Sequence, residues 1–165
     1  MLELKRLSHD AVPAALSKAE RYRLLNEPAM AESICLDILA VEAGHQQALT
    51  TLILAITDQF GHDTAGRHTA RAQQLIPRLE DEYSRAYYSA IISERRARAK
   101  LGAGRTALAR DWFGEALRGF DRAIALRPGG NDDAVLRWNA CARTLQELPG
   151  TAEAVEADDA VIMSE

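Results

Sequence analysis

Residues 113–128 read FGEALRGFDRAIALRP and form the clearest amphipathic pattern in the chain. The apolar residues of this stretch recur at spacings of three and four, which places them along one side of an α-helix. They are Phe113, Ala116, Leu117, Phe120, Ala123 and Ile124. Pro128, followed by Gly129 and Gly130, ends the pattern. The stretch therefore predicts a helix that buries one face and stops at Pro128.

A related pattern of small residues occurs twice earlier in the chain. Its three copies end at Ala43, Pro77 and Pro128, at intervals of 34 and 51 residues, and the longer interval is the same period with 17 residues inserted. A period of this length is typical of helical hairpins that stack on one another. Such stacks present extended surfaces to partners, which favours a binding role. The matched residues within the helices are Ala31, Ala65 and Ala116, followed by Ile38, Ala72 and Ala123.

Breaks in this pattern predict three hairpins and a final helix. The first hairpin begins after Pro13 and turns at residues 26–28. The second covers residues 48–77, and its weakly apolar second helix is expected to be short. The third has longer helices over residues 82–101 and 106–126, joined by a turn at 102–104. A last helix over residues 132–148 carries Trp138 on its apolar face.

The composition indicates an all-α protein of one domain. A length of 165 residues suits a single core. Hydrophobic residues (47%) and charged residues (27%) are at ordinary globular levels, whereas aromatic residues are only 5% and alanine is abundant. Alanine favours helices and allows them to approach closely. We expect an N-terminal segment at 1–12, a helical domain at 13–150 and an acidic, mobile tail at 151–165.

These residues resemble the tetratricopeptide repeat family, whose unit is a helical hairpin of about 34 residues. The resemblance covers roughly residues 13–148 and implies a right-handed α-solenoid of three antiparallel hairpins, capped by the helix of Trp138. It also implies a non-catalytic adaptor or scaffold that needs no cofactor. The residues that match the second-helix signature are Ala31, Cys35, Ile38 and Ala43, then Ala65, Thr69, Ala72 and Pro77, then Ala116, Phe120, Ala123 and Pro128.

The resemblance further implies a concave groove lined by the first helix of each hairpin. The residues that line this groove are partly apolar and partly polar, a mixture that suits a bound peptide or helix. Burial in the core of the long third hairpin is the alternative for Tyr88 and Ile92. Some family members grip a C-terminal carboxylate in the groove, and Arg95, Asn139 and Arg143 match that use, whereas the earlier hairpins do not. The groove residues are Thr50, Leu54, Thr57, Tyr88, Ile92, Arg95, Asn139 and Arg143.

Charge is distributed unevenly along the chain. Residues 1–94 carry a net charge of −4, residues 95–143 carry +6, and residues 144–165 carry −6. The basic middle segment can attract an acidic partner or the chain's own tail. A solvated helix face with internal ion pairs is the alternative. A pI near 5.6 and the lack of interleaved aromatic residues argue against nucleic acid as the partner. Self-association into a homo-oligomer is the alternative to binding another protein or peptide.

No pattern in the sequence indicates an enzyme, a metal site or a membrane span. The apolar runs are far shorter than the roughly 20 residues that cross a bilayer. The first residues lack the apolar stretch of a secretory signal, so we expect a cytoplasmic location. The four histidines do not have the spacing of helical metal ligands. Cys35 and Cys141 lie on apolar helical faces, so we expect buried thiols.

Overall fold

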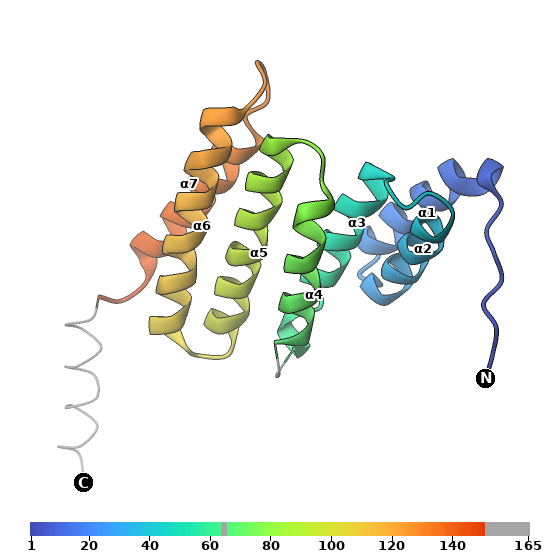
Figure 1. Cartoon of the computed structure of the whole chain (residues 1–165). Helices are drawn as coiled ribbons and strands as arrows, with labels where there is room; N and C mark the ends of the chain where they lie inside the picture. Colours follow the sequence, from blue (N-terminus) through green and yellow to red (C-terminus); the bar gives the residue numbers. More distant parts are fainter. Residues whose placement is uncertain (64–65, 151–165) are drawn as a thin grey trace, which may run out of the picture.

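The computed structural model describes residues 1–63 and 66–150, and every regular element within these ranges is helical (Figure 1). The all-α prediction is therefore confirmed. Ala65 and the predicted tail at 151–165 lie outside the described residues. The α-helices are α1 (Val12–Leu24), α2 (Pro28–Val41), α3 (Gln46–Thr57), α4 (Arg67–Leu75), α5 (Glu82–Gly102), α6 (Thr106–Leu126) and α7 (Asp133–Glu147). Short 3₁₀ helices are η1 (His9–Ala11), η2 (Phe60–His62) and η3 (Ile76–Arg78).

Local sequence explains where these helices begin and end. Asn26 adopts a left-handed conformation with φ of 58°, which few residues besides Gly and Asn tolerate, and Pro28 then opens α2. Gly104, with φ of 75°, makes the turn between α5 and α6. These two helices are 21 residues long each, whereas α4 has only nine. The predicted long third hairpin and short α4 are thus both present.

Helix α4 depends on Asp63 for its first turn. The Asp63 carboxylate accepts hydrogen bonds from the backbone N–H groups of Arg67 (3.0 Å), His68 (2.9 Å) and Thr69 (3.3 Å). Burial raises the pKa of Asp63, but these three hydrogen bonds outweigh it and hold the pKa below its ordinary value. The carboxylate therefore satisfies N–H groups of the first turn, which have no partner within an α-helix.

The helices form a row in which each one packs against the next. Figure 1 shows α1 and α2 at one end of this row and α7 at the other. The odd-numbered helices also contact one another, α1 with α3 and α3 with α5. One side of the row is consequently built from odd-numbered helices. This arrangement brings together side chains that lie far apart in the sequence.

The core consists of two clusters of buried side chains. One cluster consists of residues between Val12 and Leu79 together with Ile92 of α5, and the other belongs to α5, α6 and α7. Tyr88 packs against both clusters and so links them. Trp138 packs, partly buried, against the second cluster, and Pro128 is exposed beyond the end of α6. The repeat residues that are completely buried are Ala31, Cys35, Ile38, Ala72, Ala116, Phe120 and Ala123.

Helices α5 and α6 approach each other very closely at Gly119. A Cβ atom added to Gly119 would lie 2.7 Å from the Cβ atom and 3.2 Å from the Cα atom of Ala90. Real Cβ atoms do not approach other carbons to 2.7 Å, because their van der Waals optimum is about 3.5 to 4.0 Å. Gly119 is thus a packing requirement of the α5–α6 pair.

Both cysteines are free and completely buried, as predicted. Burial raises the pKa of Cys35 to about 12, with a smaller opposing effect from Arg23. Burial raises the pKa of Cys141 to about 12 as well. Since the thiolate is the reactive form of cysteine, neither thiol is activated for chemistry at neutral pH.

Candidate binding surface on the odd-numbered helices

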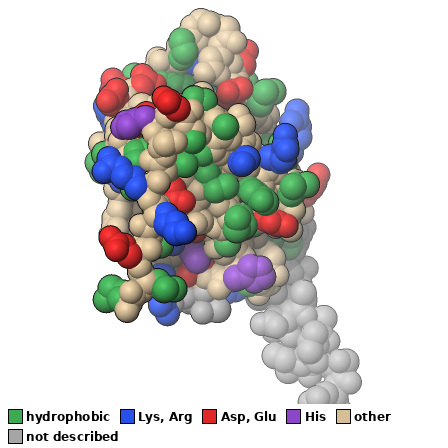
Figure 2. Space-filling model, turned by 90° about the vertical axis from the view of Figure 1, so that its right-hand side faces the viewer, with side chains coloured by type: hydrophobic (Ala, Val, Ile, Leu, Met, Phe, Trp, Pro, Cys, Tyr) green, Lys and Arg blue, Asp and Glu red, His purple; other side chains and the backbone are tan. Residues whose placement is uncertain are grey.

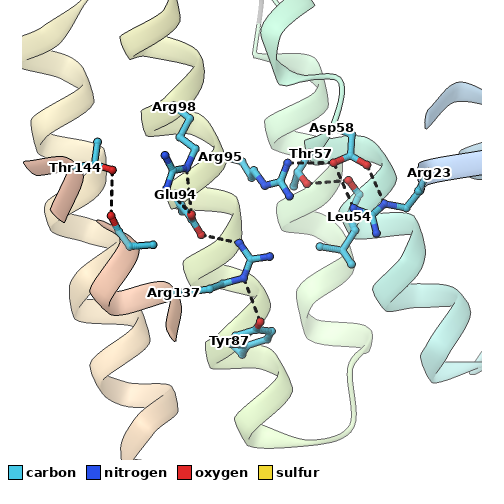
Figure 3. Close-up of polar contacts among 11 residues, drawn as sticks. Arg23, Leu54, Thr57, Asp58, Tyr87, Glu94, Arg95, Arg98, Arg137 and Thr144 are labelled. Carbon is cyan, nitrogen blue, oxygen red and sulfur yellow. Dashed lines mark hydrogen bonds and ion pairs between the residues drawn. The ribbon is translucent and has the colours of Figure 1, made fainter. Parts of the chain in front are cut away.

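An ion-pair cluster joins α1, α3 and α5 at Asp58, the residue that follows α3. The Asp58 carboxylate accepts hydrogen bonds from Arg23 Nε at 2.8 Å and Nη2 at 3.3 Å. It also accepts one from Arg95 Nη1 at 3.1 Å. Figure 3 shows both arginines pointing at Asp58 from opposite sides. One carboxylate therefore pairs with two guanidinium groups, whose residues lie 35 and 37 positions away from it in the sequence.

A second cluster joins α5 to α7 at Glu94. Arg98 donates to Glu94 Oε1 from Nε and Nη2, each at 3.1 Å. Arg137 of α7 donates to Glu94 Oε2 at 2.9 Å and to the Tyr87 hydroxyl at 3.1 Å (Figure 3). Only 4% of the Glu94 side chain is exposed. A carboxylate buried to this degree requires such pairing, because removal from water without it would be very costly.

Together these residues form what we call the arginine surface, defined as Arg23, Asp58, Glu94, Arg95, Arg98 and Arg137. Its four arginines face two carboxylates, so the surface has an excess of two positive charges. Both carboxylates already accept hydrogen bonds from two arginines each. The arginine side chains remain 21% to 41% exposed, which leaves them within reach of a ligand.

A pocket of about 390 Å³ opens on this surface. Arg23, Arg95 and Arg98 line it, with Asp58 as the only carboxylate among its lining residues. Apolar contact is also available in the pocket, since Phe60 and the exposed Leu24 contribute to its wall. The pocket combines cationic hydrogen-bond donors with apolar surface, the combination that recognises an anionic and partly apolar segment.

Arg95 and Arg137 differ in how well their charges are compensated. Burial lowers the pKa of Arg95, and the attraction of Asp58 does not fully reverse this. Burial also opposes the charge of Arg137, but the charge and hydrogen bond of Glu94 outweigh it, so its pKa is raised. Both guanidinium groups stay protonated at neutral pH. Arg95 is thus the arginine whose charge the protein compensates less.

The structure separates the predicted groove residues into accessible and buried ones. Thr57 and Ile92 are only 3% and 2% exposed. Thr57 nevertheless contributes to the lining of the pocket beside Asp58. The Thr57 hydroxyl donates to the carbonyl of Leu54 at 2.8 Å, within its own helix. Ile92 lies in the first core cluster, because α5 packs on α3 and on α6 and therefore buries two faces. Those that retain exposure are Thr50, Leu54, Tyr88, Arg95, Asn139 and Arg143.

Sequence reasoning did not assign Arg23, Glu94, Arg98 or Arg137 to the groove. A signal was present at Glu94, which interrupts the apolar spacing of buried residues in α5. A charged residue inside an apolar stripe indicates a buried ion pair, although its partner cannot be read from the same helix. The partner Arg137 lies 43 residues away. Only the packing of α7 on α5 and α6 brings the two together.

The described part of the chain contains no cluster of three or more His, Cys, Asp or Glu side chains that could hold a metal ion. Within residues 1–63 and 66–150, no helix is both long and apolar enough to cross a bilayer. Comparison of the chain with protein families, with curated proteins and with solved structures gave no match.

Proposed function

We propose that this protein is a non-catalytic interaction module that binds an acidic peptide or helix on the arginine surface. One observation carries the proposal. Three arginines, Arg23, Arg95 and Arg98, line a single pocket in which Asp58 is the only carboxylate. A carboxylate from a partner would pair with the arginine charge that Asp58 alone does not neutralise.

The shape of the module follows from the repeat pattern. Helical hairpins of the tetratricopeptide type would stack as a right-handed solenoid and place the first helices of the hairpins on the inner side. Contacts of α3 with α1 and α5 support this arrangement, as does the burial of the repeat residues Ala31 and Ala116. The arginine surface lies on these same odd-numbered helices and would occupy the inner side of such a solenoid.

Arginine chemistry explains why the partner should be acidic. The guanidinium group is planar, stays charged and matches a carboxylate with two parallel N–H donors. Hydrogen bonds of this charged kind are roughly twice as strong as neutral ones. Since Arg98 is 41% exposed, part of its attraction is screened by water and salt. Binding should therefore be weaker at high ionic strength.

A matched pair of peptides tests the proposal. One fluorescent probe is a short peptide of Glu, Leu and Ala, and the other has Gln in place of every Glu. We expect the acidic peptide to bind the full chain at least about tenfold more tightly at low salt, as measured by fluorescence anisotropy. The preference should shrink as salt is added.

Two arginine variants and one control locate the binding. Arg98→Gln and Arg95→Gln should each weaken acidic-peptide binding by about three- to tenfold. Arg118→Gln removes the same charge from an exposed position on α6 and should leave the affinity unchanged. Circular dichroism checks that each variant folds. Equal binding of the two peptides, or equal effects of all three substitutions, would refute an arginine-mediated site.

A further inference from the structure

The end of the helix row formed by α1 and α2 carries an apolar hollow that no part of the described chain fills. The hollow measures about 240 Å³ and lies against both helices and the segment before them. Figure 2 views the molecule from this end and shows hydrophobic side chains gathered near the centre of the face. We call this the end face and define it by Leu7, Ala14, Ala15, Lys18, Ile34 and Asp37.

Exposed large hydrophobic residues are most frequent in the first part of the chain. Ten such residues are exposed in the described ranges, and seven of them lie within residues 1–36. Of these seven, Leu24 lines the pocket of the arginine surface and Leu36 lines a separate hollow between α2, α3 and α4. Leu2 and Leu4 belong to the segment that leads into the end face at Leu7. Scattered exposed leucines need no explanation, but contiguous apolar surface marks an interaction site.

The charges on the end face are balanced and unpaired. Lys18 lies on α1 and Asp37 on α2, and both are exposed beside the hollow. Neither has an ion-pair partner within residues 1–63 and 66–150. A face with one cation and one anion shows no preference for an acidic or a basic partner. Such a face suits a second copy of itself, because a two-fold axis can place the cation of each copy against the anion of the other.

We propose that two copies of this chain pair through their end faces about a two-fold axis. Lys18 of each copy then faces Asp37 of the other, so that two ion pairs flank the apolar contact. The alanines Ala14 and Ala15 allow α1 helices to approach within the 8 to 10 Å of packed helices. The pair leaves the pocket of the arginine surface open, since the lining residues of that pocket and of the end face do not overlap. It would bind a partner with two acidic segments more tightly through avidity.

Sedimentation velocity across a concentration series tests the pairing with the full chain. We expect the average mass to rise from the 18.1 kDa of one chain toward twice that value and to go no further. A mass that stays at 18.1 kDa up to high micromolar concentration overturns the proposal. Growth beyond a dimer also overturns it, because a two-fold interface is closed whereas head-to-tail contacts propagate.

Two sets of variants locate the contact. Ala14→Arg places a charge in the hollow and should raise the dimer dissociation constant by at least about tenfold. Ala125→Arg introduces the same side chain at an exposed position on α6 and should change nothing. Equal dimerisation of Ala14→Arg and the wild type would place the contact elsewhere and refute the end-face interface.

Charge reversal tests the two-fold geometry itself. Lys18→Glu and Asp37→Lys should each weaken the dimer by roughly twofold to thirtyfold, because an exposed pair is worth little and symmetry counts it twice. The double variant restores opposite charges across the interface and should recover wild-type affinity. If the double variant is as weak as either single variant, Lys18 does not face Asp37 and the two-fold arrangement is wrong. These results do not depend on peptide binding, so either proposal can fail alone.

Discussion

Substitution of Gly119 by alanine tests the close packing of α5 on α6. In the interior of a helix, alanine is favoured over glycine by about 0.5 to 1 kcal/mol because glycine loses more backbone entropy on folding. At Gly119 the added methyl group would lie 2.7 Å from the Cβ atom of Ala90, and 3.2 Å from its Cα atom. Overpacking of this kind costs about 1 to 3 kcal/mol. The two effects together predict a loss of about 0 to 2.5 kcal/mol in the free energy of unfolding.

Gly114 provides a matched control on the same helix. A Cβ atom there would meet only the end of the flexible Arg118 side chain, at 3.7 Å. Gly114→Ala should therefore stabilise the protein by about 0.5 to 1 kcal/mol. The difference between the two variants isolates the overpacking cost, about 1 to 3 kcal/mol. It is measured by urea unfolding followed by circular dichroism, with the slope of the transition checked for constancy.

A double-mutant cycle assigns the clash to its partner. Ala90→Gly removes the nearer of the two clashing atoms, so it should destabilise the Gly119→Ala variant less than it destabilises the wild type. If Gly119→Ala stabilises the protein as much as Gly114→Ala does, α5 and α6 do not approach as closely as described. That result would refute the reasoning about this pair of helices.

Three further predictions concern the helix cap, the buried carboxylate and the thiols. Asp63→Ala should cost about 1 kcal/mol at neutral pH. Because the pKa of Asp63 is lowered in the folded protein, this difference in stability is fully present above the unfolded pKa of about 4 and is lost as the pH falls through the folded pKa. Unfolding of the wild type and the variant at neutral and at acidic pH would detect the change. Glu94→Gln should destabilise the protein by about 1 to 3 kcal/mol, a cost reduced because its arginine partners are 41% and 30% exposed. Glu115→Gln, at an exposed ion pair, should change stability by less than about 0.5 kcal/mol in the same unfolding assay. Cys35 and Cys141, with pKa values raised to about 12, should not react with a thiol reagent at pH 8 until denaturant is added, and rapid labelling of the native protein would contradict their burial.

Helix boundaries were accessible from the sequence because local chemistry sets them. The predicted helix over 106–126 coincides with α6. The one over 82–101 ends one residue before α5 does, and the one over 132–148 extends one residue beyond α7 at each end. Pro28, Gly104 and Pro128 mark turns through their own backbone preferences, which act without tertiary contacts. The burial of Cys35 and Cys141 followed in the same way from their place on apolar helical faces.

Assignment of the candidate site was less successful, because accessibility depends on what packs against each helix. Thr57 and Ile92 have the register of groove residues, and both side chains are buried because α3 and α5 each pack against helices on two sides. Thr57 still lines the pocket beside Asp58. Arg95 was predicted in the groove and does lie on the arginine surface. The sharing of the Asp58 carboxylate between Arg95 and Arg23 was not foreseen.

By itself the sequence determined that the chain is helical, where its long helices begin and end, and which residues lie on the apolar face of each helix, because these properties depend on neighbours within a few turns. The tertiary structure alone decided that Arg23 and Arg137 lie on one side of the helix row, that Gly119 contacts Ala90, and that the end face is left uncovered. Each of these is a relation between helices brought together by packing. The periodicity of a single helix specifies which face is apolar but not which charged groups a neighbouring helix will place beside it.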